Sequence, residues 1–105
     1  MKLQIKIYKS LNYRNNIKMG TVFNTIKKIL HEQYSIQFDQ IQPETKFELE
    51  LGTDSREFFE LITDFENAFD IKIIFNDIPD IVTIQDAVNY IEELLYQKER
   101  DENLY

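Results

Sequence analysis

Apolar residues recur every three or four positions in three stretches of the chain, which is the spacing of an amphipathic helix. The pattern predicts helices over about 21–34, 55–69 and 83–96. The apolar faces consist of Val22, Phe23, Ile26, Ile29, Leu30 and Tyr34 in the first, Phe58, Phe59, Leu61, Ile62, Phe65, Ala68 and Phe69 in the second, and Ile84, Ala87, Val88, Ile91, Leu94 and Leu95 in the third. The pattern therefore predicts three amphipathic helices between residues 21 and 96.

The segment between the first two helices is a 20-residue loop, over 35–54, in which Pro43 opposes a helix. A loop of this length in a small domain needs apolar side chains of its own to hold it in place. Apolar residues recur along it, at Ile36, Phe38, Ile41, Phe47 and Leu49. We expect the loop to pack on the helices, with Phe47 as its main contact with the core.

Polar residues mark where the helices begin. Thr21 suits the N-cap of the first helix, and Thr83 with Asp86 forms a capping box before the third. Asp54 and Glu57 have the same spacing before the second, which places Ser55 at the first helical position with its hydroxyl at the helix mouth. Helix N-termini favour phosphate. Taken alone, this arrangement is an ordinary helix start.

The residues around Ser55 make the signal more specific. They read Leu51-Gly52-Thr53-Asp54-Ser55, with Glu60-Leu61 five and six positions after the serine and Thr83-Ile84-Gln85-Asp86-Ala87-Val88-Asn89-Tyr90-Ile91 at a fixed distance beyond. Over about 22–91 the chain resembles the acyl carrier protein family. The resemblance implies an all-α fold, a four-helix bundle with three longer helices, a short third helix ending near Val82 and a long first loop. Asn76 or Asp77 could cap that short helix, with Pro79 in its first turn.

The resemblance also implies a covalent 4′-phosphopantetheine arm on Ser55, beside Asp54, with acyl groups carried on the arm as thioesters. A phosphopantetheinyl transferase would attach the arm. The family usually has Leu directly after the serine, at a position that helps partner enzymes recognise the carrier, whereas this chain has Arg56. This departure suggests a specialised lipid or secondary-metabolite pathway more than general fatty acid biosynthesis.

Acidic residues follow the polar side of the second helix, at Glu57, Glu60 and Asp64, with Arg56 beside them. Such a stripe by itself commonly serves only to solvate a helix. By the resemblance, it would meet basic patches on acyl-transferring or synthase enzymes and speed their encounter. An acyl chain would lie between the second and third helices of the bundle, against Phe59, Ile62, Phe65, Ile73 and Ile81.

Composition supports a single small domain of 105 residues with a formal charge of −7. The acidic charge disfavours nucleic acid as a partner and favours a basic protein surface. No apolar run is long enough to span a membrane and no apolar signal-peptide segment is evident, so we expect a cytoplasmic protein. The fold's usual state is a monomer. Cysteine is absent, and the carboxylates match no metal-binding loop.

Charge divides the chain into three parts. Residues 1–20 hold five basic residues and no acidic one, and we expect either a disordered extension or a basic arm that contacts the acidic domain or a partner. Residues 21–96 form the carrier-like domain, and 97–105 a charged tail that frays. With one histidine, His31, on the outer side of the first helix, no catalytic set is apparent and we expect no enzyme. The alternative is an unmodified protein-interaction module on the carrier fold.

Overall fold

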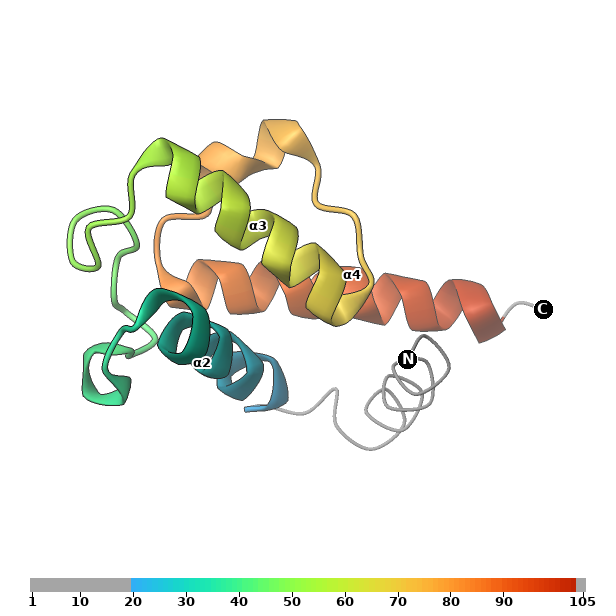
Figure 1. The fold of residues 1–105 in the computed structure, drawn as a ribbon. Coiled ribbons are helices and arrows are strands. Elements are labelled where there is room, and N and C mark those ends of the chain that lie inside the picture. Colours follow the sequence, from blue (N-terminus) through green and yellow to red (C-terminus); the bar gives the residue numbers. More distant parts are fainter. Residues whose placement is uncertain (1–19, 104–105) are drawn as a thin grey trace.

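The computed structural model describes residues 20–103, which contain three α-helices and two short 3₁₀ helices but no strand (Figure 1). In chain order these are α2 (Thr21–Tyr34), η1 (Phe38–Gln40), α3 (Ser55–Phe69), η2 (Phe75–Asp80) and α4 (Ile84–Asn103). The predicted all-α fold is confirmed, with η2 as the short third helix of the four-helix bundle. The predicted basic extension over 1–20 lies almost entirely outside the described residues.

The core lies where the apolar faces of the helices meet. Helix α2 packs against α4, and α3 runs diagonally past α4 on the side where η2 also lies (Figure 1). Ile26 of α2, Phe65 of α3 and Ile84 of α4 are completely buried. Burial of each such side chain stabilises the fold by about 1.5–3 kcal/mol. The helical periodicity of the sequence therefore identified the faces that form the core.

The long loop over 35–54 is held to the domain through Phe47, as predicted. Its ring is 2 % exposed, its N–H donates to the Val82 carbonyl at 3.1 Å, and its carbonyl accepts the Thr53 N–H at 3.1 Å. Ile41 is also buried. The prediction is wrong for Leu49, which is 76 % exposed, whereas Phe38 is 48 % exposed but stacks on His31 of α2 with ring centroids 4.1 Å apart. Short backbone turns and these few hydrogen bonds hold the loop, so not every apolar residue in it reaches the core.

The beginnings of two helices match the predicted capping. Asp54 and Glu57 form a reciprocal capping box at α3. Before α4, the Thr83 N–H donates to Asp86 Oδ2 at 2.9 Å and the Asp86 N–H donates to Thr83 Oγ1 at 3.0 Å. Thr21 is not a cap, because α2 begins at Thr21 itself and Gly20 takes the cap position in a left-handed conformation.

Two other element ends differ from the prediction. Helix η2 begins at Phe75, after an extended Ile74, because the Asp77 carboxylate accepts the Tyr90 hydroxyl instead of capping a helix. Helix α4 continues to Asn103, past the end expected near Tyr96. The Lys98 ammonium donates to the carbonyl and the carboxylate of Asp70, at 2.6 and 2.7 Å, and this ties the extra turns to the end of α3.

Substitution of Asp86 by alanine is expected to lower the free energy of unfolding at pH 7 by about 1 kcal/mol, the usual value of a helix cap. The hydrogen bond from the Thr83 N–H, helped by that from Val82, lowers the pKa of Asp86 below its ordinary value. Its contribution is therefore present above about pH 4 and is lost as pH falls through the folded-state pKa. Urea unfolding of wild type and variant should show a difference in the free energy of unfolding that becomes smaller below about pH 4. The exposed Asp80→Ala is the control, and a gap that stays constant with pH would contradict the assignment.

Candidate functional site

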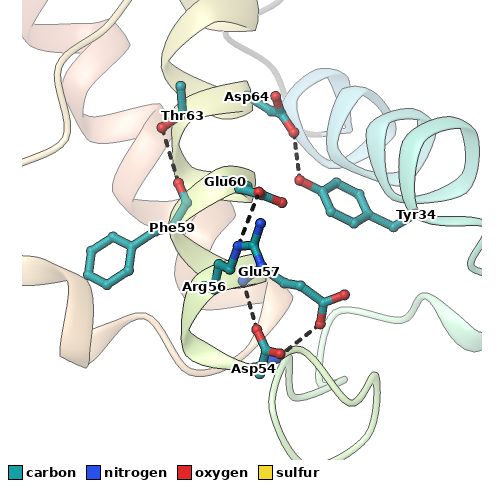
Figure 2. Close-up of polar contacts among 8 residues, drawn as sticks. All are labelled: Tyr34, Asp54, Arg56, Glu57, Phe59, Glu60, Thr63 and Asp64. Atoms are coloured by element: carbon teal, nitrogen blue, oxygen red, sulfur yellow. Dashed lines mark hydrogen bonds and ion pairs between the residues drawn. The ribbon is translucent and has the colours of Figure 1, made fainter.

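Ser55 is the first residue of α3 and its side chain is exposed. Asp54 Oδ1 accepts the Glu57 N–H at 2.8 Å, and Glu57 Oε1 accepts the Asp54 N–H at 3.2 Å (Figure 2). These two bonds fix the helix entry without using the Ser55 hydroxyl, which makes no hydrogen bond to any residue that the structure describes. The hydroxyl is thus accessible at the positive end of a helix dipole.

A cavity of about 250 Å³ opens beside Ser55, between the start of α3 and η2. Thr53, Asp54 and Ser55 form its polar rim. Its wall is mostly apolar and consists of Phe47, Phe58, Phe59, Ile78, Pro79, Ile81 and Val82, with Glu48 at the edge. The serine therefore lies at the mouth of a space that can hold an apolar group.

The predicted acyl-binding residues divide into two groups. Phe59 and Ile81 line the cavity. Ile62, Phe65 and Ile73 do not reach it, because they are packed in the core with at most 5 % of their surface exposed. Phe47, Phe58, Ile78 and Val82 were not predicted to line the cavity, since only the return of the loop and of η2 over α3 brings them together.

The acidic stripe on α3 is present, but all three of its carboxylates have partners within the chain (Figure 2). Glu57 completes the capping box, and Glu60 Oε2 lies 3.9 Å from Arg56 Nε. Asp64 Oδ2 accepts the Tyr34 hydroxyl at 2.7 Å, which links α3 to the end of α2. Burial and the bond to Asp64, with the nearby charges of Glu60 and Glu57, raise the pKa of Tyr34 well above its ordinary value.

The Arg56–Glu60 pair is exposed, with side-chain exposures of 88 % and 57 %. Such i,i+4 pairs contribute only about 0.3–0.5 kcal/mol. Arg56 can therefore leave Glu60 at little cost and meet another anion. It introduces a positive charge directly after Ser55, ahead of the first carboxylate of the acidic stripe and beside Glu60.

Tyr90 holds η2, one wall of the cavity, in position. Its hydroxyl donates to Asp77 Oδ2 at 2.6 Å and accepts the Ile74 N–H at 3.2 Å. Burial and the bond to Asp77 raise the pKa of Tyr90 above its ordinary value. Neither this contact nor the Tyr34–Asp64 bond was predicted, because both join residues on different elements and leave no periodic signal in the sequence.

Nothing in the described part of the chain gathers three or more metal-ligating side chains. None of the helices between residues 20 and 103 is long and apolar enough to cross a membrane. His31 is exposed, donates from Nδ1 to the Ile36 carbonyl at 2.9 Å and stacks on Phe38. The site thus consists of an accessible serine, a helix N-terminus, an apolar cavity and a charged helix face.

Comparison with known proteins assigns the chain to a family. A family profile described as "Phosphopantetheine attachment site" matches residues 24–91. The chain is also 40 % identical over 73 residues to the protein named "Acyl carrier protein" of Campylobacter lari, an alignment that covers 70 % of this chain and 95 % of that protein. The chain belongs to the acyl carrier protein family. Acyl carrier proteins are carriers and not enzymes, and they receive 4′-phosphopantetheine covalently in the domain that the profile describes.

The residues present suit that prosthetic group. A phosphodiester needs a reachable hydroxyl, and Ser55 is the residue at the helix mouth that offers one without breaking any existing bond. The partial positive charge of the α3 N-terminus favours the phosphate. The apolar cavity next to it suits the less polar end of a loaded arm. Family membership also implies a phosphopantetheinyl transferase and acyl-handling enzymes as partners.

Proposed function

We propose that this chain tethers acyl intermediates as thioesters on a 4′-phosphopantetheine arm attached to Ser55. The observation that carries the proposal is the exposed Ser55 hydroxyl, unbonded within the described chain, at the mouth of α3 and on the rim of an apolar cavity. Asp54 acts indirectly, since its cap positions the first turn and so the serine.

The attachment is a phosphoryl transfer in which Ser55 Oγ is the nucleophile. Oγ forms a bond to the phosphorus of coenzyme A that bears the pantetheine, and the bond from that phosphorus to the bridging oxygen breaks. The nucleotide part of coenzyme A leaves with this oxygen, and the hydroxyl proton passes to a base of the transferase. The flexible arm then keeps its thioester at high effective concentration near each partner's active site.

We propose that the α3 surface around Ser55 guides these partners. Glu57, Glu60 and Asp64 would attract basic patches, and Arg56 would select partners that place an anion near the serine. The internal bonds of the three carboxylates leave each with further acceptor capacity, since a carboxylate has about four lone-pair sites. Arg56 supports use of this carrier in a specialised lipid or secondary-metabolite pathway. We also propose that the carrier acts as a monomer in the cytoplasm.

Incubation with coenzyme A, Mg²⁺ and a broad-specificity phosphopantetheinyl transferase tests the proposal. Intact mass spectrometry should show a gain of one phosphopantetheine per chain. Absence of any gain, with this enzyme and with the transferase from the same genome, would contradict the carrier proposal. It would favour the unmodified interaction module instead, with Arg56 as the block, and Arg56→Leu would then be expected to restore modification.

We further propose that the cavity beside Ser55 receives the acyl chain, with Phe59 and Ile81 in contact with it and Ile62, Phe65 and Ile73 as the core behind it. Because that core is closely packed, deeper entry would have to displace large side chains. A short acyl group is therefore expected to fit the cavity completely, whereas the end of a long one would remain in water. Thioesters of short acyl groups should accordingly be hydrolysed more slowly. A crystal structure of an acylated form with a deep tunnel past Phe65 would contradict this.

A further inference from the structure

An exposed aromatic pair lies next to the proposed attachment site. The rings of Phe59 on α3 and Phe75 at the start of η2 are stacked, with centroids 5.8 Å apart and planes inclined by 10°. Phe59 is 44 % exposed and Phe75 is 69 % exposed, and Ile74 beside them is 55 % exposed. Figure 2 shows the Phe59 ring directed away from the Tyr34–Asp64 side of α3. Two large aromatics with this much surface in water are unfavourable for an isolated chain.

The cavity does not account for the pair. Phe59 lines the cavity, but Phe75 does not. Phe75 is therefore not needed to shield an acyl group, and the fold does not bury it elsewhere. An apolar surface of this kind next to a functional residue is typical of a protein interface.

The pair is continuous with a surface that a partner must cover. Phe59 follows Ser55 by one helical turn, about 6 Å along the axis. An enzyme that closes on the Ser55 hydroxyl with even a small interface buries roughly 600 Å² of the carrier, a patch of roughly 14 Å radius. Such a patch includes Phe59 and its stacked neighbour. The exposed Arg56 and Glu60 would lie at its polar rim.

We propose that the Phe59–Phe75 pair inserts into an apolar socket beside the active site of the phosphopantetheinyl transferase that modifies this chain. This inference rests on the proposed attachment at Ser55. The pair supplies rigid apolar contact area, while the neighbouring charges orient the approach. A lipid surface is a poorer occupant, since the chain carries a formal charge of −7.

The test is steady-state kinetics of the phosphopantetheinyl transferase from the same genome, with coenzyme A, Mg²⁺ and the full-length chain as the varied substrate. Phe75→Ser is expected to raise KM about tenfold and leave kcat within about twofold, as for loss of a hot-spot contact. Phe75→Leu should keep most of the affinity. Tyr96→Ser removes an aromatic of similar exposure, on α4, and should behave as wild type.

The possible results separate the two proposals. If the wild type is modified and Phe75→Ser has the same KM as the wild type, the socket proposal is overturned and the carrier function stands. A wild type that is never modified overturns both. Sedimentation velocity of the same proteins tests whether the chain self-associates through the pair. A concentration-dependent dimer that Phe75→Ser abolishes, with no change in KM, would show that the pair binds a second copy and would overturn the proposal. Thermal unfolding should show that Phe75→Ser folds, since the side chain is mostly in water.

Discussion

Alanine in place of Ser55 is expected to eliminate the gain of phosphopantetheine completely and to leave the fold intact. The hydroxyl is the proposed nucleophile, and alanine has no group that can replace it. The helix start does not depend on it, because the Asp54–Glu57 capping box makes both of its hydrogen bonds without Ser55. Intact mass after incubation with coenzyme A, Mg²⁺ and the transferase measures the loss, and circular dichroism checks the helices.

Ser35 provides a matched control for this experiment. It is an exposed serine at the other end of the first loop, in a left-handed conformation with φ of 58°. Glycine adopts that conformation without strain, so Ser35→Gly should fold and gain one phosphopantetheine as wild type does. A Ser55→Ala chain that still gained the full mass would place the attachment elsewhere. A stable partner complex that survives Ser55→Ala, with no mass gain in the wild type, would support the interaction module.

The largest loss of stability is expected from Phe47→Ala, at about 3–5 kcal/mol in the free energy of unfolding. The ring is 2 % exposed and packs against Phe58 of α3, with ring centroids 5.2 Å apart. Its removal leaves a cavity under the loop that positions Gly52 to Asp54 ahead of the serine. Urea unfolding at neutral pH measures the change, and for a domain of this size such a loss can exceed half of the total stability.

Leu49→Ala separates burial from simple loss of an apolar side chain. Leu49 belongs to the same loop, two residues from Phe47, but is 76 % exposed. Its replacement should change the free energy of unfolding by less than about 0.5 kcal/mol. Equal effects of the two substitutions would show that the loop is not anchored through Phe47. A slower modification of Phe47→Ala at a temperature where it remains folded would show that the anchor also positions Ser55.

The sequence by itself determined the helical elements and the candidate attachment residue. Helix periodicity is a local property, so the faces around Ile26, Phe65 and Ile84 could be predicted before any contact was known. Caps are local too, since Asp54–Glu57 and Thr83–Asp86 join residues three positions apart. The placement of Ser55 at the α3 start followed from the first of these caps. Phe47 could be predicted as the loop contact with the core because a loop of this length needs one. The exposure of Leu49 and Phe38 could not be predicted from the sequence.

Only the tertiary structure decided what surrounds Ser55. The cavity wall combines residues of the first loop, α3 and η2, which are up to 35 positions apart in sequence. The Tyr34–Asp64 and Tyr90–Asp77 bonds and the Phe59–Phe75 stack likewise join separate elements. Such contacts depend on how helices cross and loops return, and neither leaves a repeating pattern in the sequence. Local order along the chain thus determined the helices and the serine, and long-range packing decided the cavity, the pairing of the acidic stripe and the exposed aromatic pair.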